Sequence, residues 1–409
     1  MLLKRVFNFF YISFLVSQLC LASIYIYDIP LRAYFIAAGF IVCVIMLIFF
    51  ESESIWNNAY IRNISFLFIG FAFSSFMAFL ISRVLYDNTL SLKSFLFLLT
   101  RFLIQLWIAF FISSYFLKQN GIVPLLWSVM LYAALSGLVA FFQFLGIETF
   151  WKMKFLFTTD LNKYIVTFIT SHTDSQRAAG LSLYFISLSY EMLLSLPLGI
   201  YLITRSAGKW RWLAVFCSIM ILLGLVASKT MSAYLALTIM LLLWFYGKGK
   251  RKITISLIFL ILIGSYIFRD HFTFLLASLK ARMGFWQVAI KTFLKYPFGI
   301  PFLREYGRYS SQFYSPDLPD IVGSVPHNQF LNTVISYGLG GIICLFLFFF
   351  LLYKRAMKIH DNHLALLMVC AFSGYFVHSF FHNLGMFYND VFFWVFAAVF
   401  FVQPDHKNG

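Results

Sequence analysis

The residues with the clearest capacity for chemistry are a histidine and an asparagine at the start of an apolar stretch. Pro326-His327-Asn328 follows a long polar segment and opens the run "QFLNTVISYGLGGI". A neutral imidazole can take a proton from a hydroxyl group. The carboxamide of Asn328 can orient either that imidazole or a substrate hydroxyl. A histidine at a helix start is more commonly a cap or a surface residue, so a structural role stays open beside the catalytic one.

Cationic residues accumulate in the same part of the chain. The polar segment 269–327 carries seven lysine and arginine residues, and the polar segment 146–180 carries four. Anionic lipid headgroups would attract such segments. A diphosphate is the sharper alternative, because guanidinium groups form paired, charge-assisted bonds with phosphate oxygens. The acidic residues of both segments are scattered, and no Cys or His spacing is typical of a metal site, so no metal is expected.

The elements that must position these residues are membrane helices. Of the 409 residues, 62% are hydrophobic and 11% are charged, which excludes a soluble globular protein of ordinary composition. Because loops and strand edges facing lipid would leave backbone groups unsatisfied, each apolar run is predicted to be a helix. The predicted fold is all-α, a polytopic membrane protein forming one domain over residues 1–409. Its twelve candidate spans are residues 6–27, 33–50, 64–82, 95–117, 124–145, 181–203, 212–228, 231–246, 253–268, 328–352, 364–381 and 390–402.

The charge of the short breaks between these runs predicts the orientation. Three breaks are strongly basic, at 204–211, 247–252 and 353–363. The alternate breaks at 28–32, 82–93, 227–232 and 381–390 are poorer in positive charge. Positive residues favour the cytoplasmic side, so both termini are predicted to be cytoplasmic. The two long segments, 146–180 and 269–327, are then loops on the opposite side.

The second long segment contains a predicted amphipathic helix. Over residues 275–297, apolar side chains recur at helical spacing, and Pro297 and Gly299 end the pattern. The stripe consists of Leu279, Met283, Trp286, Ile290, Phe293 and Leu294. We expect this helix to lie at the membrane interface. The following stretch, 304–324, has two prolines and several tyrosines and is predicted to be a flexible lid.

Four stretches together resemble the O-antigen ligase and polymerase superfamily of bacterial envelope glycosyltransferases. "RMGFWQVAIKTFLKYPFGIPF" (282–302) is similar to its Arg-x-x-x-Trp helix and Pro-x-Gly turn. "HNQFLNTVISYGLGGI" (327–342) is similar to its His-Asn dipeptide before a Gly-x-x-Gly helix. "QRAAGLSLYFISLSYEML" (176–193) and "LLGLVASKTMSAYLAL" (222–237) resemble two further family segments, although Lys229 stands where arginine is usual.

The resemblance implies a GT-C-like membrane glycosyltransferase that needs no metal or cofactor. Its donor would be a glycan on undecaprenyl diphosphate, attacked by an acceptor hydroxyl at the periplasmic face of the bacterial inner membrane. Partners would be inner-membrane lipid and a chain-length regulator, with no nucleic acid. The implied catalytic residues are His327, as general base, and Arg282. The implied substrate-binding residues are Arg177, Lys229, Trp286 and Asn328.

Three functions stay open on this sequence. A polymerase would join glycan repeats to one another, and a ligase would join a finished chain to lipid A-core. The rather short, tyrosine-rich second loop favours the polymerase. A flippase for the lipid-linked oligosaccharide is the alternative of another class. A transporter more often shows two related halves, and no internal repeat is evident here.

Overall fold

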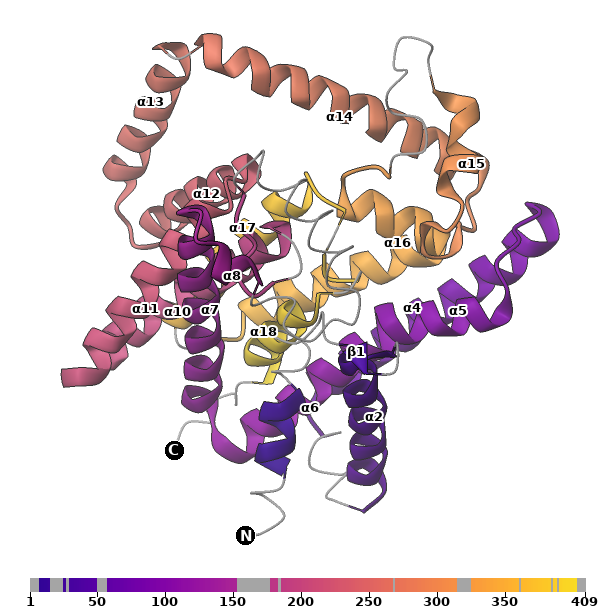
Figure 1. Cartoon of the computed structure of the whole chain (residues 1–409), viewed down its shortest axis with the longest axis horizontal. Helices are drawn as coiled ribbons and strands as arrows, with labels where there is room; N and C mark the ends of the chain where they lie inside the picture. The colour runs from indigo at the N-terminus through magenta and orange to yellow at the C-terminus, as the bar shows by residue number, and fades with distance from the viewer. Residues whose placement is uncertain are drawn as a thin grey trace.

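The computed structural model describes residues 7–14, 25–26, 29–49, 57–152, 177–182, 185–267, 269–314, 325–359, 362–383, 385–387 and 390–402. These residues are largely helical (Figure 1), and two-residue strands, β1 (Tyr25–Ile26) and β2 (Ile29–Pro30), form one antiparallel pair. The all-α prediction is confirmed. The first predicted span, 6–27, is helical over 7–14, and its predicted end is wrong because β1 occupies residues 25–26.

The helices follow the predicted apolar runs closely. In chain order they are α2 (Leu31–Phe49), α4 (Ala59–Leu85), α5 (Leu92–Leu99), the π-helical turn η1 (Thr100–Ile104), α6 (Gln105–Asn120), α7 (Ile122–Phe144), α8 (Glu148–Lys152), α10 (Phe185–Arg205), α11 (Gly208–Ala227), α12 (Met231–Gly247), α13 (Arg251–Ile267), α14 (Arg269–Lys295), the 3-10 turn η3 (Pro301–Leu303), α15 (Tyr306–Ser310), the 3-10 turn η4 (Ser311–Phe313), α16 (Gln329–Ala356), α17 (Asn362–Ser379) and α18 (Val391–Val402).

Six helices within the described residues are long and apolar enough to cross a membrane. They are Ala59–Leu85, Leu92–Asn120, Ile122–Phe144, Phe185–Arg205, Gly208–Ala227 and Gln329–Ala356. A helix needs about 20 apolar residues to cross the hydrocarbon core. The chain is therefore a membrane protein with multiple spans, and the count of twelve stays a prediction.

The last helix, α18, is the core of the bundle rather than an outer span. All twelve of its residues are buried, and Figure 1 shows it among the other helices. The indole of Trp394 lies 4.5 Å from the ring of Phe68 in α4, 5.9 Å from Phe110 in α6 and 5.7 Å from Phe348 in α16. A helix of this length is too short to cross a bilayer unaided, and burial of its whole surface is the usual alternative.

Contacts that involve the breaks between helices are found at two ends of the bundle. At one end, Tyr309 OH of α15 donates to Tyr86 O at 3.1 Å, so the 82–93 break meets the second long loop. At the other end, the basic break 204–211 meets the start of α7 through Trp210, whose ring lies 5.6 Å from that of Trp127. Which end faces the cytoplasm stays a prediction.

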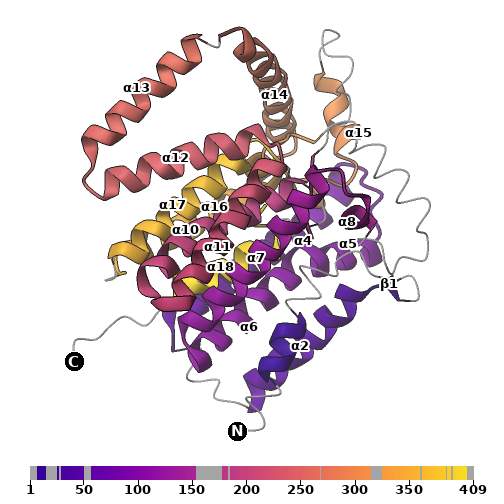
Figure 2. The same ribbon diagram turned by 60° about the vertical axis from the view of Figure 1, so that its left-hand side comes forward.

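Helices α13 and α14 form an arch at the first of these ends. Figures 1 and 2 both show α13 standing off the bundle and α14 crossing its end. α14 packs on α16. The predicted apolar stripe is divided in the structure: its outer members are exposed, whereas Trp286 and Phe293 are half-buried toward the bundle. The exposed members are Leu279, Met283, Ile290 and Leu294.

α16 is interrupted where a turn from the second loop enters it. Gly338 has φ 61° and ψ −152°, which breaks the helical path. Leu339 N donates to Pro297 O at 2.9 Å, and Ile300 N donates to Ile335 O at 2.7 Å. The turn thus satisfies backbone groups that the kink frees. A side chain at Gly338 would overlap the backbone of Phe298. The absence of a side chain at Gly338 therefore allows the turn at Pro297 and Phe298 to pack directly against α16.

Candidate functional site

Arg177 is held on a short segment fixed to the ends of two spans. Ala179 N and Gly180 N both donate to Gln143 Oε1 of α7, at 3.0 and 2.8 Å. Ala178 N donates to Ala227 O at the end of α11, at 3.1 Å. The guanidinium itself is exposed and lies 5.0 Å above the ring of Phe185. The segment therefore holds the Arg177 cation next to the ends of α7 and α11.

Arg282 of α14 reaches down to the loop between α17 and α18. Its Nη1 donates to Phe381 O at 2.9 Å, and its guanidinium lies 5.3 Å above the Phe381 ring. Partial burial, and then the like charge of Arg177, lower the pKa of Arg282. Within the described residues, neither guanidinium pairs with a carboxylate. Two cations that repel each other and, among the described residues, pair with no carboxylate form a site suited to an anion.

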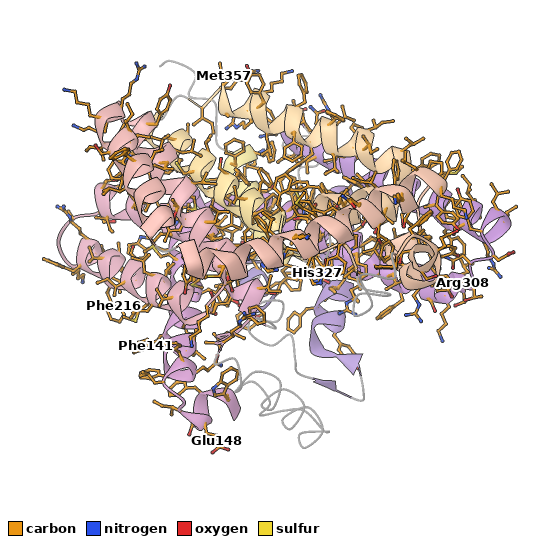
Figure 3. All side chains as sticks on the ribbon, turned by 90° about the horizontal axis from the view of Figure 1, so that it is seen from above. Phe141, Glu148, Phe216, Arg308, His327 and Met357 are labelled. Carbon is orange, nitrogen blue, oxygen red and sulfur yellow. The ribbon has the colours of Figure 1, made fainter. Side chains whose placement is uncertain are left out.

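His327 lies beside this pair. Its ring is 5.5 Å from that of Phe285, in α14, and its Nδ1 is 3.5 Å from Nδ2 of Asn383. Burial, followed by the positive charge of Arg282, lowers the pKa of His327. The imidazole is therefore neutral at neutral pH, the state in which it accepts a proton. In the view onto the end of the bundle that α14 crosses, His327 lies near the middle of the molecule and Arg308 lies near its edge (Figure 3).

The backbone at His327 is strained. Its φ of 50° is in the left-handed region, which costs a residue with a side chain about 1–3 kcal/mol. Such conformations persist where the surroundings impose them, and they concentrate at functional sites. Lys229 shares this feature, with φ 46°.

Asn328 has a structural role in this arrangement. Its Oδ1 accepts from Leu331 N at 3.1 Å, so it is the N-cap of α16, and the residue is 4% exposed. The asparagine that contacts the imidazole is Asn383 instead. The role of Asn328 toward the imidazole or a substrate hydroxyl therefore stays a prediction.

Trp286 lies next to the same loop as Arg282. Its ring is 6.4 Å from that of Phe381. Its indole Nε1 is buried and has no hydrogen-bond partner in the described part of the chain. A buried tryptophan N–H usually finds an acceptor, so this donor remains available to one.

Lys229 contacts an aromatic ring at the end of a span. Its Nζ lies 5.2 Å above the ring of Phe144 at the end of α7. The hairpin that carries it is fixed to α10, where Ser189 Oγ lies 3.0 Å from Ser228 Oγ and 3.1 Å from Thr230 Oγ1. Electrostatic interactions therefore link Arg177 to Arg282 and Arg282 to His327. The Lys229 ammonium lies over an aromatic ring.

A buried cluster next to this site was not predicted. Ser232 Oγ, at the start of α12, lies 2.8 Å from His382 Nε2 and 2.9 Å from His378 Nδ1. The pKa of His382 falls well below its usual value, first by burial and then by the nearby His378, Arg282, His327 and Arg177. One signal was present in the sequence: His-Asn occurs twice, at 327–328 and at 382–383.

The predicted lid is wrong for residues 304–314. Tyr306 and Tyr309 are 2% and 4% exposed, so they are packed rather than presented to a sugar or to the bilayer. Arg308 Nη1 donates to Asp87 O at 3.1 Å, which fixes α15 on the 82–93 break. Residues 315–324 lie outside the described part of the chain.

Residues 212–346, about a third of the chain, match the family model described as O-antigen ligase. The match confirms the resemblance to the O-antigen ligase and polymerase superfamily. The matched segment runs from α11 to α16 and includes Lys229, Arg282, Trp286 and His327. No curated protein matches the chain.

Proposed function

We propose that this chain, whose residues 212–346 match the O-antigen ligase family, is a membrane glycosyltransferase. It transfers a glycan from undecaprenyl diphosphate to a hydroxyl of another lipid-linked repeat unit, as an O-antigen or related surface polysaccharide polymerase. The reaction takes place at the periplasmic face of the bacterial inner membrane, with both termini in the cytoplasm. The observation that supports this most directly is the placement of Arg177 and Arg282 beside the neutral His327.

The two guanidinium groups suit the diphosphate of such a donor. Two like charges at a half-buried site disfavour each other, and an anion between them relieves that cost. Negative charge grows on the diphosphate as its bond to the anomeric carbon breaks. Preorganised cations stabilise that developing charge, and this electrostatic effect is commonly the largest contribution to catalysis. In this proposal Arg177 and Arg282, rather than a divalent ion, supply the neutralisation.

His327 supplies the proton acceptor. The acceptor hydroxyl gives its proton to the imidazole while its oxygen bonds to the anomeric carbon of the donor glycan. The bond from that carbon to the diphosphate breaks, and the lipid diphosphate leaves with the electron pair. General-base assistance of this kind is worth roughly 10²–10⁴ in rate.

A ligase is the second candidate, and the match to the family described as O-antigen ligase favours it. Donor and chemistry are the same in the two cases, and the acceptor differs: a second lipid-linked repeat for the polymerase, lipid A-core for the ligase. The Arg177, Arg282 and His327 cluster serves both. The acceptor is therefore what an experiment must vary.

The test uses the full chain, purified in lipid nanodiscs without an ion gradient. Supplied with undecaprenyl-diphosphate-linked repeats alone, a polymerase produces a ladder of extended glycans. If product forms only when lipid A-core is added, the chain is a ligase. Absence of glycan transfer with either acceptor, together with gradient-driven movement of the lipid-linked glycan in vesicles, would show a transporter and overturn the proposal.

Variants of the cluster complete this test. Arg282→Ala and His327→Ala should each lower transfer by about 10²-fold or more. Lys291→Ala is the matched control, because Lys291 is an exposed cation of the same helix, α14. It should leave transfer unchanged.

A further inference from the structure

We propose that Asn383 is a positioning residue for His327. In the reacting state, the carboxamide oxygen of Asn383 accepts the Nδ1–H of His327, which leaves Nε2 unprotonated and turned toward the acceptor hydroxyl. This inference rests on the proposed function, because it concerns how the base of that reaction is oriented.

The contact between the two side chains carries the proposal. Asn383 Nδ2 and His327 Nδ1 are 3.5 Å apart, although the residues are 56 positions apart in the chain. Asn332 of α16 donates from Nδ2 to Asn383 O at 3.1 Å and to Asn383 Oδ1 at 3.4 Å. The three residues form a line that begins one turn inside α16 and ends on the imidazole. Catalytic hydrogen bonds are often long before substrate binds and shorten in the complex.

The two ends of a carboxamide match the two tautomers of the imidazole. With Nδ2 toward His327, Nδ1 must be the unprotonated nitrogen, and the proton is on Nε2. A half-turn of the carboxamide puts Oδ1 in that place and stabilises the tautomer with its proton on Nδ1. The turn gives up the 3.4 Å contact from Asn332 to Oδ1 and keeps the 3.1 Å bond to the backbone oxygen. In the turned state Nε2 is free to act as the base, and the same oxygen continues to accept from Nδ1–H after the proton has moved.

The residues before Asn383 are fixed on two sides. Phe381 O accepts from Arg282 of α14 at 2.9 Å. His382 Nε2 lies 2.8 Å from Ser232 Oγ, at the start of α12. Asn383 is therefore carried by a segment that two other elements of the site hold in place.

Gly385 is fixed as well. Gly385 lies against the carboxamide of Gln329, so closely that a side chain at this position would overlap it. Gln329 is fully buried in the first turn of α16 and has little room to move away. The segment is thus seated on α16, the helix that His327 precedes, which keeps the distance between Asn383 and His327 short.

Among the described residues, two charged or titratable groups interact with His327 directly, namely Arg282 of α14 and His382, which follows α17. Arg177, on the segment before α10, and His378 of α17 interact with His382. The two arginines disfavour a second positive charge nearby. A neutral acceptor such as a carboxamide oxygen orients the imidazole without cancelling the cations that the donor diphosphate needs, whereas a carboxylate in the same place would do both.

The test compares Asn383→Asp and Asn383→Leu with the wild-type chain in nanodiscs. The probe is diethyl pyrocarbonate, which modifies neutral imidazole. Peptide mass spectrometry follows the rate of modification of His327 as a function of pH, and the midpoint of this pH profile reports the pKa of the imidazole. Asn383→Asp should raise the midpoint by about one pH unit or more, because a carboxylate stabilises the imidazolium. Asn383→Leu should lower the midpoint, because it removes the acceptor for Nδ1–H. A merely structural role would shift both variants in the same direction or neither, and either of these results overturns the inference.

Further variants guard against misfolding and against general charge effects. Asn332→Ala removes the 3.1 Å bond that anchors the Asn383 backbone and also the 3.4 Å contact that opposes the turn, so it should shift the midpoint by less than either Asn383 variant does. Asn120→Asp is the matched control, because the Asn120 carboxamide bonds that of Asn8 at 3.0 Å at the opposite end of the bundle. It should leave the midpoint at His327 unchanged, and an equal shift in this variant would overturn the inference.

The glycan-transfer assay separates this inference from the proposed function. Asn383→Leu should lower kcat by roughly 10–100-fold, the usual effect of losing the partner that orients a functional histidine, with the donor KM unchanged. If the wild-type chain transfers no glycan while the midpoints shift as expected, the function fails and the contact stands. If glycan is transferred and the midpoints do not move, the function stands and the role of Asn383 fails.

Discussion

Ser232 Oγ and His382 Nε2 lie 2.8 Å apart, and this contact joins the start of α12 to the end of α17. The same oxygen lies 2.9 Å from Nδ1 of His378. A hydroxyl has one proton, so it donates to one histidine and accepts from the other. Ser232 therefore couples the tautomers of two buried imidazoles next to the cationic pair.

Ser232→Ala should destabilise the protein by about 1–3 kcal/mol, because it leaves two buried ring nitrogens without a partner. Thermal unfolding in detergent measures this change in stability, and the loss of the monodisperse peak is used to monitor the unfolding. Ser128→Ala is the control, since the exposed Ser128 hydroxyl bonds only its own helix, at Pro124 O. Equal unfolding temperatures for the two variants would show that the Ser232 contacts contribute no stability.

The lowered pKa of His327 fixes the sign of the pH dependence. A base must be unprotonated, so transfer should persist to lower pH than a histidine of ordinary pKa would allow, and it should fall as the pH drops through the lowered pKa of His327. Arg282→Gln removes the neighbouring positive charge that helps to lower the pKa of His327. The pKa of His327 then rises, and the acid limb of the normalised kcat/KM profile should move to higher pH. Lys291→Gln should leave that limb in place, and an unmoved limb in Arg282→Gln would remove the coupling between the two residues.

Much of the fold follows from the sequence because apolar runs and polar breaks determine where membrane helices begin and end. α12 begins at the predicted residue, and α17 and α18 begin within two residues of theirs. The complete burial of α18 inside the bundle could not be predicted in this way. Its composition is that of a span, and only the surrounding helices show that its whole surface is buried within protein.

Part of the candidate site could be predicted, because some of its residues lie in local sequence patterns. Arg177, Arg282 and His327 were identifiable because each is a cation or an imidazole at a recognisable local pattern. Asn383 and Ser232 act through contacts with residues 56 and 150 positions away. No local pattern encodes such contacts, and the second His-Asn dipeptide was their only trace in the sequence.

The position of the Lys229 ammonium predicts a small role in donor binding. Lys229→Ala should change the donor KM by no more than about threefold, because a cation–π contact at such a site is worth about 0.5–1 kcal/mol. Lys229→Gly separates charge from backbone, since glycine adopts the positive φ found here without strain. Steady-state kinetics with the lipid-linked donor measures both variants. A 100-fold rise in KM in both would place the ammonium on the diphosphate after all.

Gly338 should tolerate no side chain. Gly338→Ala combines a left-handed backbone with overlap against the Phe298 backbone, so it should destabilise the protein by about 2 kcal/mol or more. Gly70→Ala is the matched control, because it is an ordinary helical position whose added methyl group meets one side-chain atom, Cys344 Sγ at 3.0 Å. Detergent unfolding temperatures compare the two, and a smaller loss at Gly338 than at Gly70 would contradict the insertion of the turn into α16.

Gln143 should act on donor binding without touching the donor. Its carboxamide accepts from Ala179 N and Gly180 N and donates to Gly180 O, so it fixes the backbone that follows Arg177. Gln143→Leu removes these three bonds, together with the one that Nε2 donates to Phe150 O at 3.0 Å. It leaves two buried N–H groups without that partner, which loosens the position of the Arg177 guanidinium. Gln143→Glu keeps the acceptor oxygen for both N–H groups and is the conservative comparison. The donor KM should rise about tenfold in Gln143→Leu, equivalent to about 1.4 kcal/mol of binding energy, and much less in Gln143→Glu. Equal KM values in the two variants would show that the segment holds Arg177 without this carboxamide.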